Sequence, residues 1–484
     1  MKGKNMLNQR YAAIDQGTTG TRIVIVEENG EIHSPMAIPH QQITPENGWV
    51  EHDAEEILNN IQHCLASGGE VDAIGLCHQG ESIVAWDSVT GKPVYHAIVW
   101  QDMRTESALA VLKDEGKEAL VQEKTGLPLD PYFSASKMGW ILNNVAKASE
   151  LLQKGQLRIG TMDSFFMDRL CGEFVTDFSA ASRTSLFNIH TLAWDVEMCE
   201  LFGVPIHCLP EVKDTIGELG LYHCNGKDIP VTALIVDQFA GVFGHGCRDS
   251  GDAKVTFGTG TFAQALTGNE IAEFGEYGLL PTLCWKFPNE QPVYGLDGGV
   301  YNAASAINWV RSLGLFTDFD ALENFHKDSA ISRGLAFVPA LSGLGCPYWD
   351  RSAAGLWAGL SLETTREDML QSVLEGIALR SAEVILSMDK LSPLGKRISI
   401  DGGLTQNKYF KQFLSDVLNK ELIVPENNEV TSIGTALLAR KGLGVEGEIQ
   451  LNQSAEIIYP REINQTEILN KYKEIVSRSR ELRS

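Results

Sequence analysis

Two turns rich in glycine and threonine are the first places in the sequence where phosphate chemistry is possible. One is Asp15-Gln-Gly-Thr-Thr-Gly-Thr-Arg22 and the other is Phe257-Gly-Thr-Gly-Thr261. Glycine lets backbone N–H groups approach a phosphate closely, and threonine adds hydroxyl donors. The carboxylate of Asp15 can orient a hydrated Mg²⁺ ion, which prefers oxygen ligands. Each turn alone is equally typical of an ordinary hairpin with a polar tip.

Two further motifs place polar residues at the ends of strands. In Ala233-Leu-Ile-Val-Asp237, followed by Gln238, an acid ends an apolar run. Phosphoryl transfer to a hydroxyl needs a base that accepts the hydroxyl proton, although an acid here can equally be a helix N-cap. In Asp401-Gly-Gly-Leu-Thr-Gln-Asn407, two glycines join a strand to a helix. They favour close packing of a base or ribose against the backbone, or simply a strand-to-helix turn.

The elements around these motifs follow a similar order in two halves. The first half has strands at 11–15 and 21–26, an Asn29-Gly30 hairpin signal, a helix after the N-cap Asp53 and a strand at 71–76. The second half has strands at 253–257, 262–267 and 293–296, a helix at 302–311, a strand at 397–401 and a helix at 407–418. This order predicts an α/β protein with duplicated mixed sheets and helices. The turn-rich stretch Gly244 to Gly251 predicts a boundary between domains 1–247 and 248–484. Two glycine turns facing each other across the interdomain cleft would hold the phosphates of ATP.

Composition excludes several classes of protein. The 484 residues include 63 acids and 40 bases, a net charge of −23, which disfavours binding to nucleic acid. The nine cysteines form no C-x-x-C pair, so we expect reduced thiols rather than disulfides. Met1 to Arg10 contains no apolar signal region, and no run approaches the roughly 18 to 20 apolar residues that span a bilayer. We therefore expect a cytoplasmic protein that does not bind a membrane.

The same residues resemble a known family. Tyr132-Phe-Ser-Ala-Ser-Lys-Met-Gly-Trp140-Ile is similar to the first signature of the FGGY carbohydrate kinases, and Gly355 to Glu375 is similar to the second. The glycerol-specific members of that family are also similar at 48–53, 91–101, 130–133, 181–192 and 343–350. This resemblance covers nearly the whole chain. It implies a two-domain actin-like ATPase (ribonuclease H-like) fold with the active site in the interdomain cleft. It also implies ATP-dependent phosphorylation of a small polyol, with glycerol as the expected substrate.

The resemblance also implies a role for individual residues. Asp237 is the expected catalytic base, and Asp15 is expected to hold Mg²⁺ through water. The expected substrate-binding residues are Gly80, Glu81, Trp100, Tyr132, Asp237, Gln238 and Phe262. The expected nucleotide-binding residues are Thr18, Thr19, Gly20, Arg22, Thr259, Gly260, Ala304, Asn308, Gly403 and Asn407. Family members are often dimers or tetramers, so the resemblance also implies a homo-oligomer.

The most informative departure from the family is at Gly80. Glycerol-specific members carry Asn-Gln-Arg-Glu where this chain has His78-Gln-Gly-Glu81. Losing the hydrogen bond of a charged arginine costs roughly 1.5–3 kcal/mol unless another group replaces it. The glycine leaves room, which favours a longer substrate such as a tetritol or a pentulose. Alternatively, His78 or Arg104 replaces the arginine.

Two other departures are milder. Ala304-Ser305 and Asn308 stand where related kinases tend to have glycine and glutamine near the nucleotide. The segment Gly226 to Ile229 is shorter than the loop that binds a sugar bisphosphate inhibitor in some relatives and lacks its arginine, so we predict no such inhibition. A non-catalytic actin-like ATP-binding protein is the alternative class, and Asp15, Asp237 and both glycine turns argue against it. A sugar-binding transcriptional regulator would need a basic helix-turn-helix domain, which the sequence does not indicate.

Overall fold

The chain divides into two units that interleave along the sequence. The computed structural model describes residues 9–224, 226–273, 277–323, 325, 328–452 and 454–482. The first unit comprises 1–246, 282–294 and 429–452, and the second comprises 247–281, 295–428 and 453–484. The chain first changes unit between Gly246 and Cys247, but two later segments return to the first unit, which a single linear boundary cannot express. Residues 1–8, for which we expect no signal peptide, lie outside the described residues.

A six-stranded sheet with the order β13-β14-β5-β1-β2-β3 forms the centre of the first unit. Its strands are β1 (Arg10–Gln16), β2 (Gly20–Glu27), β3 (Ile32–Pro39), β5 (Ala73–His78), β13 (Ile216–Cys224) and β14 (Lys227–Val236). β1, β5 and β14 are neighbouring parallel strands, whereas β2 is antiparallel to β1. The carboxyl ends of the three parallel strands therefore meet at one edge of the sheet, where ligands of α/β proteins commonly bind.

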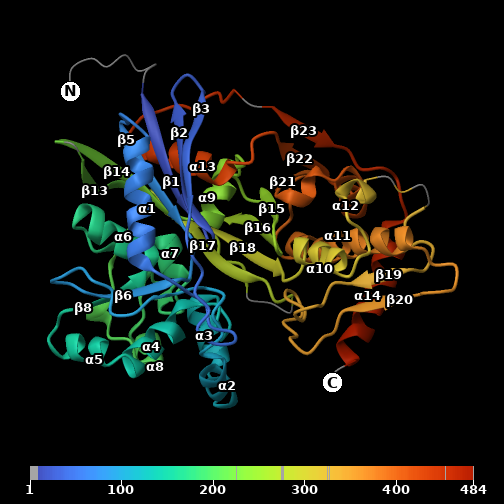
Figure 1. Cartoon of the computed structure of the whole chain (residues 1–484), viewed down its shortest axis with the longest axis horizontal. Coiled ribbons are helices and arrows are strands. Elements are labelled where there is room, and N and C mark those ends of the chain that lie inside the picture. The colour runs from blue at the N-terminus through green and yellow to red at the C-terminus, as the bar shows by residue number, and fades with distance from the viewer. Residues whose placement is uncertain are drawn as a thin grey trace. The chain divides into compact units, whose positions relative to one another are not determined.

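Helices cover both faces of this sheet. On one face, α1 (Ala54–Ser67) and α6 (Met162–Cys171) pack against apolar side chains of the strands. On the other face, α13 (Val430–Gly442) packs against β1, β5, β14 and α9 (Asp237–Gly244). Figure 1 shows α13, coloured red-orange because it comes late in the chain, among the blue strands of the first unit. A Cβ atom at Gly75 would lie 2.6 Å from the carbonyl oxygen of Thr435, so glycine permits this close packing.

A smaller layer of the first unit continues from β5. Its four-stranded sheet has the order β4-β7-β6-β8, with β4 (Glu51–His52), β6 (Ile83–Asp87), β7 (Ala97–Ile98) and β8 (Leu157–Thr161). The helices here are α2 (Glu106–Asp114), α3 (Glu118–Thr125), α4 (Ser134–Asn144), α5 (Ala146–Gln153), α7 (Phe178–Ser182) and α8 (Val196–Phe202). Short strands β9 (Val175–Asp177), β10 (Phe187–Asn188), β11 (Ala193–Trp194) and β12 (Glu211–Lys213) complete it. β6 starts two residues after Glu81 and α4 starts two residues after Tyr132, so this layer fixes both residues.

The second unit contains most of a seven-stranded sheet with the order β17-β18-β16-β15-β21-β22-β23. Its strands are β15 (Ala253–Phe257), β16 (Thr261–Gly268), β17 (Leu280–Trp285), β18 (Val293–Val300), β21 (Arg397–Asp401), β22 (Glu421–Pro425) and β23 (Ala455–Ile458). β16 is antiparallel to β15, as β2 is to β1. On the other side of β15, β21 and β22 run parallel to it, as β5 and β14 run parallel to β1. The duplicated order that the sequence predicts is therefore present.

Four helices and a short antiparallel pair of strands accompany the second sheet. They are α10 (Ala304–Ser312), α11 (Arg366–Leu391), α12 (Lys408–Leu418) and α14 (Gln465–Glu481), with β19 (Ala336–Val338) and β20 (Leu356–Ala358). α11 contributes many buried residues to the core of this unit, which explains why its sequence is apolar on most sides.

Local signals in the sequence agree with the observed boundaries. Asp53 caps α1, because its side chain accepts hydrogen bonds from the backbone N–H groups of Glu55 and Glu56. Asn407 caps α12 in the same way through the N–H group of Phe410. The nine cysteines, all within the described residues, are free thiols. Among the residues that the structure describes, no helix is long and apolar enough to cross a membrane.

Candidate active site

Three neighbouring parallel strands of the first unit each end in a predicted site residue. Asp15 is the second-last residue of β1. Glu81 lies three residues after the end of β5, and Asp237 directly follows β14. Because these carboxyl ends share one edge of the sheet, residues far apart in sequence are brought to the same edge. This edge is the candidate substrate side of the first unit.

Asp237 is fixed where β14 becomes α9. One carboxylate oxygen, Oδ1, accepts the N–H group of Gln238 at 2.7 Å. The side-chain amide of Gln238 donates to the hydroxyl of Tyr132 at 3.3 Å. The structure therefore brings together three of the residues that the sequence predicts as substrate contacts. A carboxylate, an amide and a phenol in one place can accept and donate hydrogen bonds to several hydroxyl groups.

Glu81 lies at a tight turn with a left-handed backbone. Its φ is 59°, and the N–H group of Ser82 donates to the carbonyl of Gly80 at 2.7 Å across it. A non-glycine residue in this conformation costs of order 1–3 kcal/mol, and such residues concentrate at functional sites. The hydroxyl of Ser134 holds the turn by donating to the carbonyl of Glu81 at 3.0 Å. The surrounding structure thus maintains a strained turn that presents a carboxylate.

Arg183 is the functional candidate that sequence reasoning missed. Its Nε donates to Oε1 of Glu81 at 2.6 Å, and both side chains are almost completely buried. Its guanidinium carbon lies 5.8 Å from the centre of the Tyr132 ring and 5.4 Å from that of Phe133. A short contact with a guanidinium favours an ionised Glu81, which can only accept hydrogen bonds. The available signal was a lone arginine in the otherwise uncharged, buried stretch from 180 to 189.

The two groups that the sequence offered as replacements for an arginine at position 80 have other partners. His78 is fully buried, with Nε2 3.5 Å from Oδ1 of Asp163. Arg104 pairs with Glu51 at 2.7 Å and with Asp102 at 2.8 Å. Arg183 is therefore the arginine that this structure places on the Glu81 carboxylate.

Trp100 connects Tyr132 to the first glycine turn. Its ring packs edge-on against Tyr132, with centroids 5.5 Å apart. Its indole N–H donates to the hydroxyl of Thr18 at 3.1 Å. Trp100 thus contacts a predicted substrate residue and a predicted phosphate residue at once. Phe262, the other predicted aromatic wall, lies on β16 of the second unit beside Gly299.

The first glycine turn carries charges. Asp15 and Arg22 face each other across β1 and β2, with Nε 3.7 Å from Oδ2. Arg22 also pairs with Glu429 at 2.6 Å, and the hydroxyl of Ser432 donates to Asp15 at 3.1 Å. Burial raises the pKa of Asp15 above its usual value, and Arg22 opposes this shift. A bound cation would offset the same desolvation, so an oxygen donor at this position fits Mg²⁺.

The rest of this turn is shaped by backbone contacts. A Cβ atom at Gly20 would lie 2.8 Å from the carbonyl oxygen of Ile38. The carbonyl of Thr18 lies 3.0 Å from Nε2 of His40, and that of Thr19 accepts the N–H group of His40 at 3.3 Å. With both carbonyls engaged, the turn is held in one conformation.

The second glycine turn is held by the start of α10. The carbonyl of Thr259 accepts the N–H groups of Ala303 at 2.9 Å and Ser305 at 3.2 Å, and that of Gly258 accepts Ala304 at 3.1 Å. A Cβ atom at Gly260 would lie 2.5 Å from the carbonyl oxygen of Val300. The predicted nucleotide residues Thr259, Gly260 and Ala304 therefore lie together in the second unit. Asn308 follows one helical turn later on α10.

Gly403 and Asn407 flank a short turn before α12. Gly402 has a φ of 96°, and a Cβ atom there would lie 2.3 Å from the carbonyl oxygen of Phe257, whereas a Cβ atom at Gly403 meets open space. The side chain of Asn407 has structural partners, because its amide donates to Leu322 at 2.6 Å and its oxygen accepts from Phe410 at 2.7 Å. Contact of Gly403 and Asn407 with adenosine stays a prediction.

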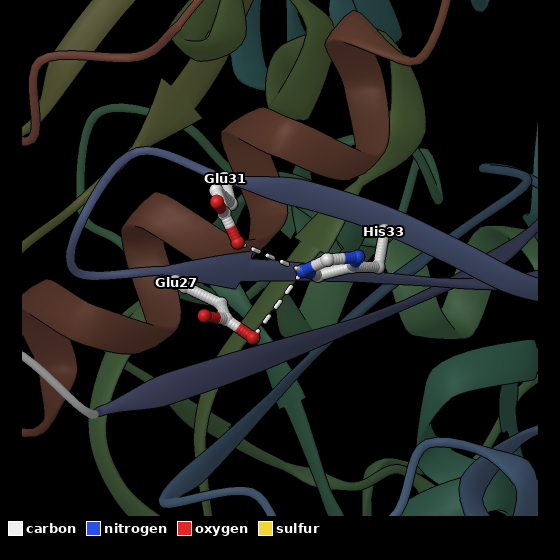
Figure 2. A group of neighbouring side chains, drawn as sticks. All are labelled: Glu27, Glu31 and His33. Atoms are coloured by element: carbon white, nitrogen blue, oxygen red, sulfur yellow. Dashed lines mark ion pairs between the residues drawn. The ribbon is translucent and has the colours of Figure 1, made fainter.

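One cluster of possible metal ligands lies elsewhere in the first unit. Figure 2 shows Glu27 and Glu31 next to His33. Nε2 of His33 lies 3.3 Å from Oε1 of Glu27 and 3.7 Å from Oε2 of Glu31. Arg10 also contacts Glu27, at 3.2 Å. Glu27 is at the end of β2 opposite Gly20, so this hairpin end is remote from the Asp15 turn. With Arg10 as a partner, the cluster is a surface ion-pair network.

The fold and these residues together define a class of enzyme. Each unit presents a glycine and threonine turn after the first strand of its sheet, and the first unit adds a buried carboxylate site beside an acid at a strand end. These groups are the ones that a phosphotransferase with an alcohol group as acceptor needs.

Comparison with known proteins identifies the family. The N-terminal domain model of the FGGY family of carbohydrate kinases matches residues 10–244, and the C-terminal domain model matches residues 253–442. The chain belongs to the FGGY family of carbohydrate kinases. A glycerol kinase of Halothermothrix orenii is 41% identical over 91% of both chains, and one of a Geobacter species is 40% identical over 90% of both.

Solved structures agree with this fold. The glycerol kinase of Plasmodium falciparum, crystallised with ADP, superposes with a TM-score of 0.91 at 30% identity, covering 99% of both chains. The gluconate kinase of Lactobacillus acidophilus superposes with a TM-score of 0.84 at 22% identity, covering 98% of this chain and 97% of the other. The second likeness shows the two-domain fold alone. The predicted actin-like fold class is therefore confirmed.

Proposed function

We propose that the protein transfers the γ-phosphoryl group of ATP to a terminal hydroxyl of glycerol, giving glycerol 3-phosphate and ADP. The observation that carries this proposal is the grouping of Asp237, Gln238 and Tyr132, to which Trp100 adds an aromatic wall. Glycerol kinases at about two-fifths identity over nine-tenths of the chain support the choice of substrate.

Asp237 is the proposed base. Its carboxylate accepts the proton of the attacking hydroxyl, the oxygen forms a bond to the γ-phosphorus, and the bond from that phosphorus to the leaving oxygen of ADP breaks. Since Oδ1 is held by the N–H group of Gln238, the carboxylate keeps a fixed orientation. Fixed orientation lowers the entropic cost of reaching the reactive geometry.

Glu81 is the proposed anchor for the hydroxyls that do not react. Arg183 holds one of its oxygens, and an ionised carboxylate can accept hydrogen bonds from neighbouring hydroxyl groups. Trp100 and Tyr132 would contact the C–H surface of the polyol and exclude water, which favours transfer over hydrolysis.

ATP and Mg²⁺ are the proposed cofactors. Thr18, Thr19, Gly20 and Arg22 would bind phosphate from the first unit, and Thr259 and Gly260 from the second. Asp15 would hold Mg²⁺ through water, and the ion would neutralise charge on the transferred group. The adenosine would contact Ala304, Asn308, Gly403 and Asn407.

A coupled assay of ADP release over a panel of polyols and ketoses tests this proposal. Glycerol should stimulate ADP release by the wild type, and Asp237→Asn should lower kcat by about 10²- to 10⁴-fold. Asp228→Asn is the matched control, because Asp228 is an exposed acid on the same strand. The proposal fails if no polyol stimulates the wild type above Asp237→Asn.

Phosphorylation of a longer polyol or ketose is the second candidate. The observation that favours it is the glycine at position 80, which removes a charged donor. The same panel separates the two candidates, because a tetritol or pentulose would then give a higher kcat/KM than glycerol.

A further inference from the structure

Position 80 is packed against Val236. An ideal Cβ atom built on Gly80 would lie 3.0 Å from Cγ1 of Val236 and 3.6 Å from Cγ2, and all three of its nearest atoms belong to Val236. Real Cβ atoms rarely approach another carbon so closely. The room that the sequence led us to expect at Gly80 is therefore reduced at the Cβ position, because Val236 packs tightly against it.

Val236 has little freedom to move away. It is completely buried, and its β-branched side chain has few rotamers. Its backbone pairs with His78 across β14 and β5, and its N–H group donates to the hydroxyl of Ser179 at 3.0 Å. Asp237 is the next residue, so a shift of Val236 would also shift the proposed base.

Gly80 in turn controls the placement of Glu81. Its carbonyl closes the tight turn through Ser82, and Glu81 within that turn has the left-handed backbone. The Glu81 carboxylate lies on Arg183. Position 80 thus connects the strand that delivers the base to the turn that delivers the polyol anchor.

We propose that Gly80 and Val236 form a specificity-determining pair, an inference that rests on the proposed polyol kinase function. Val236 crowds any side chain at position 80, and the glycine there supplies no side-chain donor, so the anchor Glu81 has Arg183 as its guanidinium partner. The same valine fills the space beside Gly80, at the turn that carries Glu81. The pair therefore restricts the site to a three-carbon polyol.

A double-mutant cycle tests the pair. Gly80→Arg alone should lower kcat/KM for glycerol at least about 20-fold, because the arginine must displace Val236 and with it Asp237. Val236→Gly alone should raise the ratio of kcat/KM for erythritol to that for glycerol at least about fivefold. The double variant Gly80→Arg/Val236→Gly should recover glycerol turnover. Its KM for glycerol should be about tenfold below that of Val236→Gly, since a charged donor is added.

Val231→Gly provides the matched control for the rescue. Val231 is a buried valine on the same strand, five residues earlier, and is not among the atoms nearest to Gly80. Combined with Gly80→Arg, it should not restore glycerol turnover. Equal rescue by Val231→Gly would mean that any loosening of β14 suffices, and it would overturn the proposed pair. Wild-type activity of Gly80→Arg alone would overturn it too.

Thermal unfolding separates failure of the pair from failure of the polyol kinase function. If the wild type phosphorylates no polyol, the proposed function is lost. The packing contact can still be measured, because Gly80→Ala should lower Tm and Val236→Ala should relieve that loss. Should Val236→Gly fail to fold, the same two alanine variants and their double supply the kinetic cycle. Additive effects in that cycle on both Tm and KM would refute the coupling.

Discussion

The two glycine turns have the same place in their sheets, yet only the first has an acid and a base paired across its hairpin. Gly17-Thr-Thr joins β1 to β2, and Gly258-Thr-Gly joins β15 to β16. The cross-strand pair one position from each turn is Asp15 with Arg22 in the first unit and Thr256 with Phe262 in the second. The comparison indicates that turns at the same place in the two sheets differ in the charges on their hairpins.

The difference follows from what holds each turn. The second turn is fixed by backbone hydrogen bonds to the start of α10, which need no charge. The first turn is approached by α13, whose N-terminal region brings Glu429 to Arg22 and Ser432 to Asp15. Under the proposed function, the second turn binds phosphate through N–H groups, and the first turn also handles the metal ion.

Among changes at the two turns, removing the Asp15 charge should have the largest effect on activity. Asp15→Asn is expected to lower kcat about 100-fold or more, because electrostatic groups at phosphoryl-transfer sites contribute on that scale. Thr256→Val changes the equivalent position in the second unit and should lower kcat less than about fivefold. Steady-state ADP release at saturating polyol and several Mg²⁺ concentrations measures both. Equal losses would show that the two turns do not divide the work by charge.

Buried ionisable groups extend the comparison to pH. In the first unit, Lys137 is fully buried, donates to the carbonyls of Pro131 and Tyr132, and has its pKa lowered by burial to about 7. In the second, burial raises the pKa of Glu375 to about 7, although Tyr409 and two backbone N–H groups hydrogen-bond to it. Both groups favour their neutral forms, but their charges have opposite signs.

The two units should therefore respond to pH in opposite directions. Between pH 4.5 and 7, folded Glu375 binds more protons than unfolded glutamate, so the free energy of unfolding falls as pH rises. Between pH 7 and 10.5, folded Lys137 binds fewer protons than unfolded lysine, so the free energy of unfolding rises with pH. At about 1.4 kcal/mol per pKa unit, Glu375 contributes about 3 kcal/mol and Lys137 about 5 kcal/mol over their windows.

Glu375→Gln and Lys137→Met separate the two contributions. Glu375→Gln should gain stability relative to wild type between pH 4.5 and 7, and Lys137→Met should lose it between pH 7 and 10.5. Hydrogen exchange measured for amides of each unit over the pH series assigns the change to its own unit. The pH comparison is wrong if either variant keeps the wild-type slope in its window.

Crowding at the two turns predicts an intermediate effect on stability. A Cβ atom at Gly260 would lie 2.5 Å from the carbonyl oxygen of Val300, whereas one at Gly17 would have its nearest neighbour at 3.8 Å. Gly260→Ala should therefore reduce the free energy of unfolding by about 1–3 kcal/mol, and Gly17→Ala by much less. Urea unfolding of both variants checks this. A larger loss for Gly17→Ala would contradict the geometry.

The sequence allowed the two turns and the acids at strand ends to be predicted, because glycine, threonine and aspartate there are local signals. The duplicated sheet order and the caps at Asp53 and Asn407 were predictable for the same reason. Arg183 was not, since its partner Glu81 is 102 residues away and the residues around it are uncharged. The contact of Gly80 with Val236 was not predictable either, because the two residues are far apart in the sequence.

The sequence also did not indicate that α13 belongs to the first unit. Its residues follow a long stretch of the second unit, and a boundary drawn from local turn signals assigns each half of the chain to one domain. Only packing shows that Thr435 lies against Gly75 of β5. Contacts between distant segments decide such assignments, and one sequence alone carries no record of them.

Arg22 gives the smallest expected effect on stability and the finest test of the charged turn. Its side chain is 45% exposed, so its pairs with Asp15 and Glu429 should be worth no more than about 1 kcal/mol to folding. Arg22→Gln should therefore unfold within that margin of wild type, with a difference that shrinks as salt is added. Its KM for ATP should nevertheless rise several-fold, since the proposed function makes Arg22 a phosphate-binding cation. Lys227→Gln is the control, because it removes an exposed cation paired with Glu70 on the same unit. It should change stability as little and leave the KM for ATP unaltered.

If Arg22→Gln behaves like Lys227→Gln in both respects, the charge at the first turn contributes to the fold and not to nucleotide binding. The two turns would then differ in packing alone.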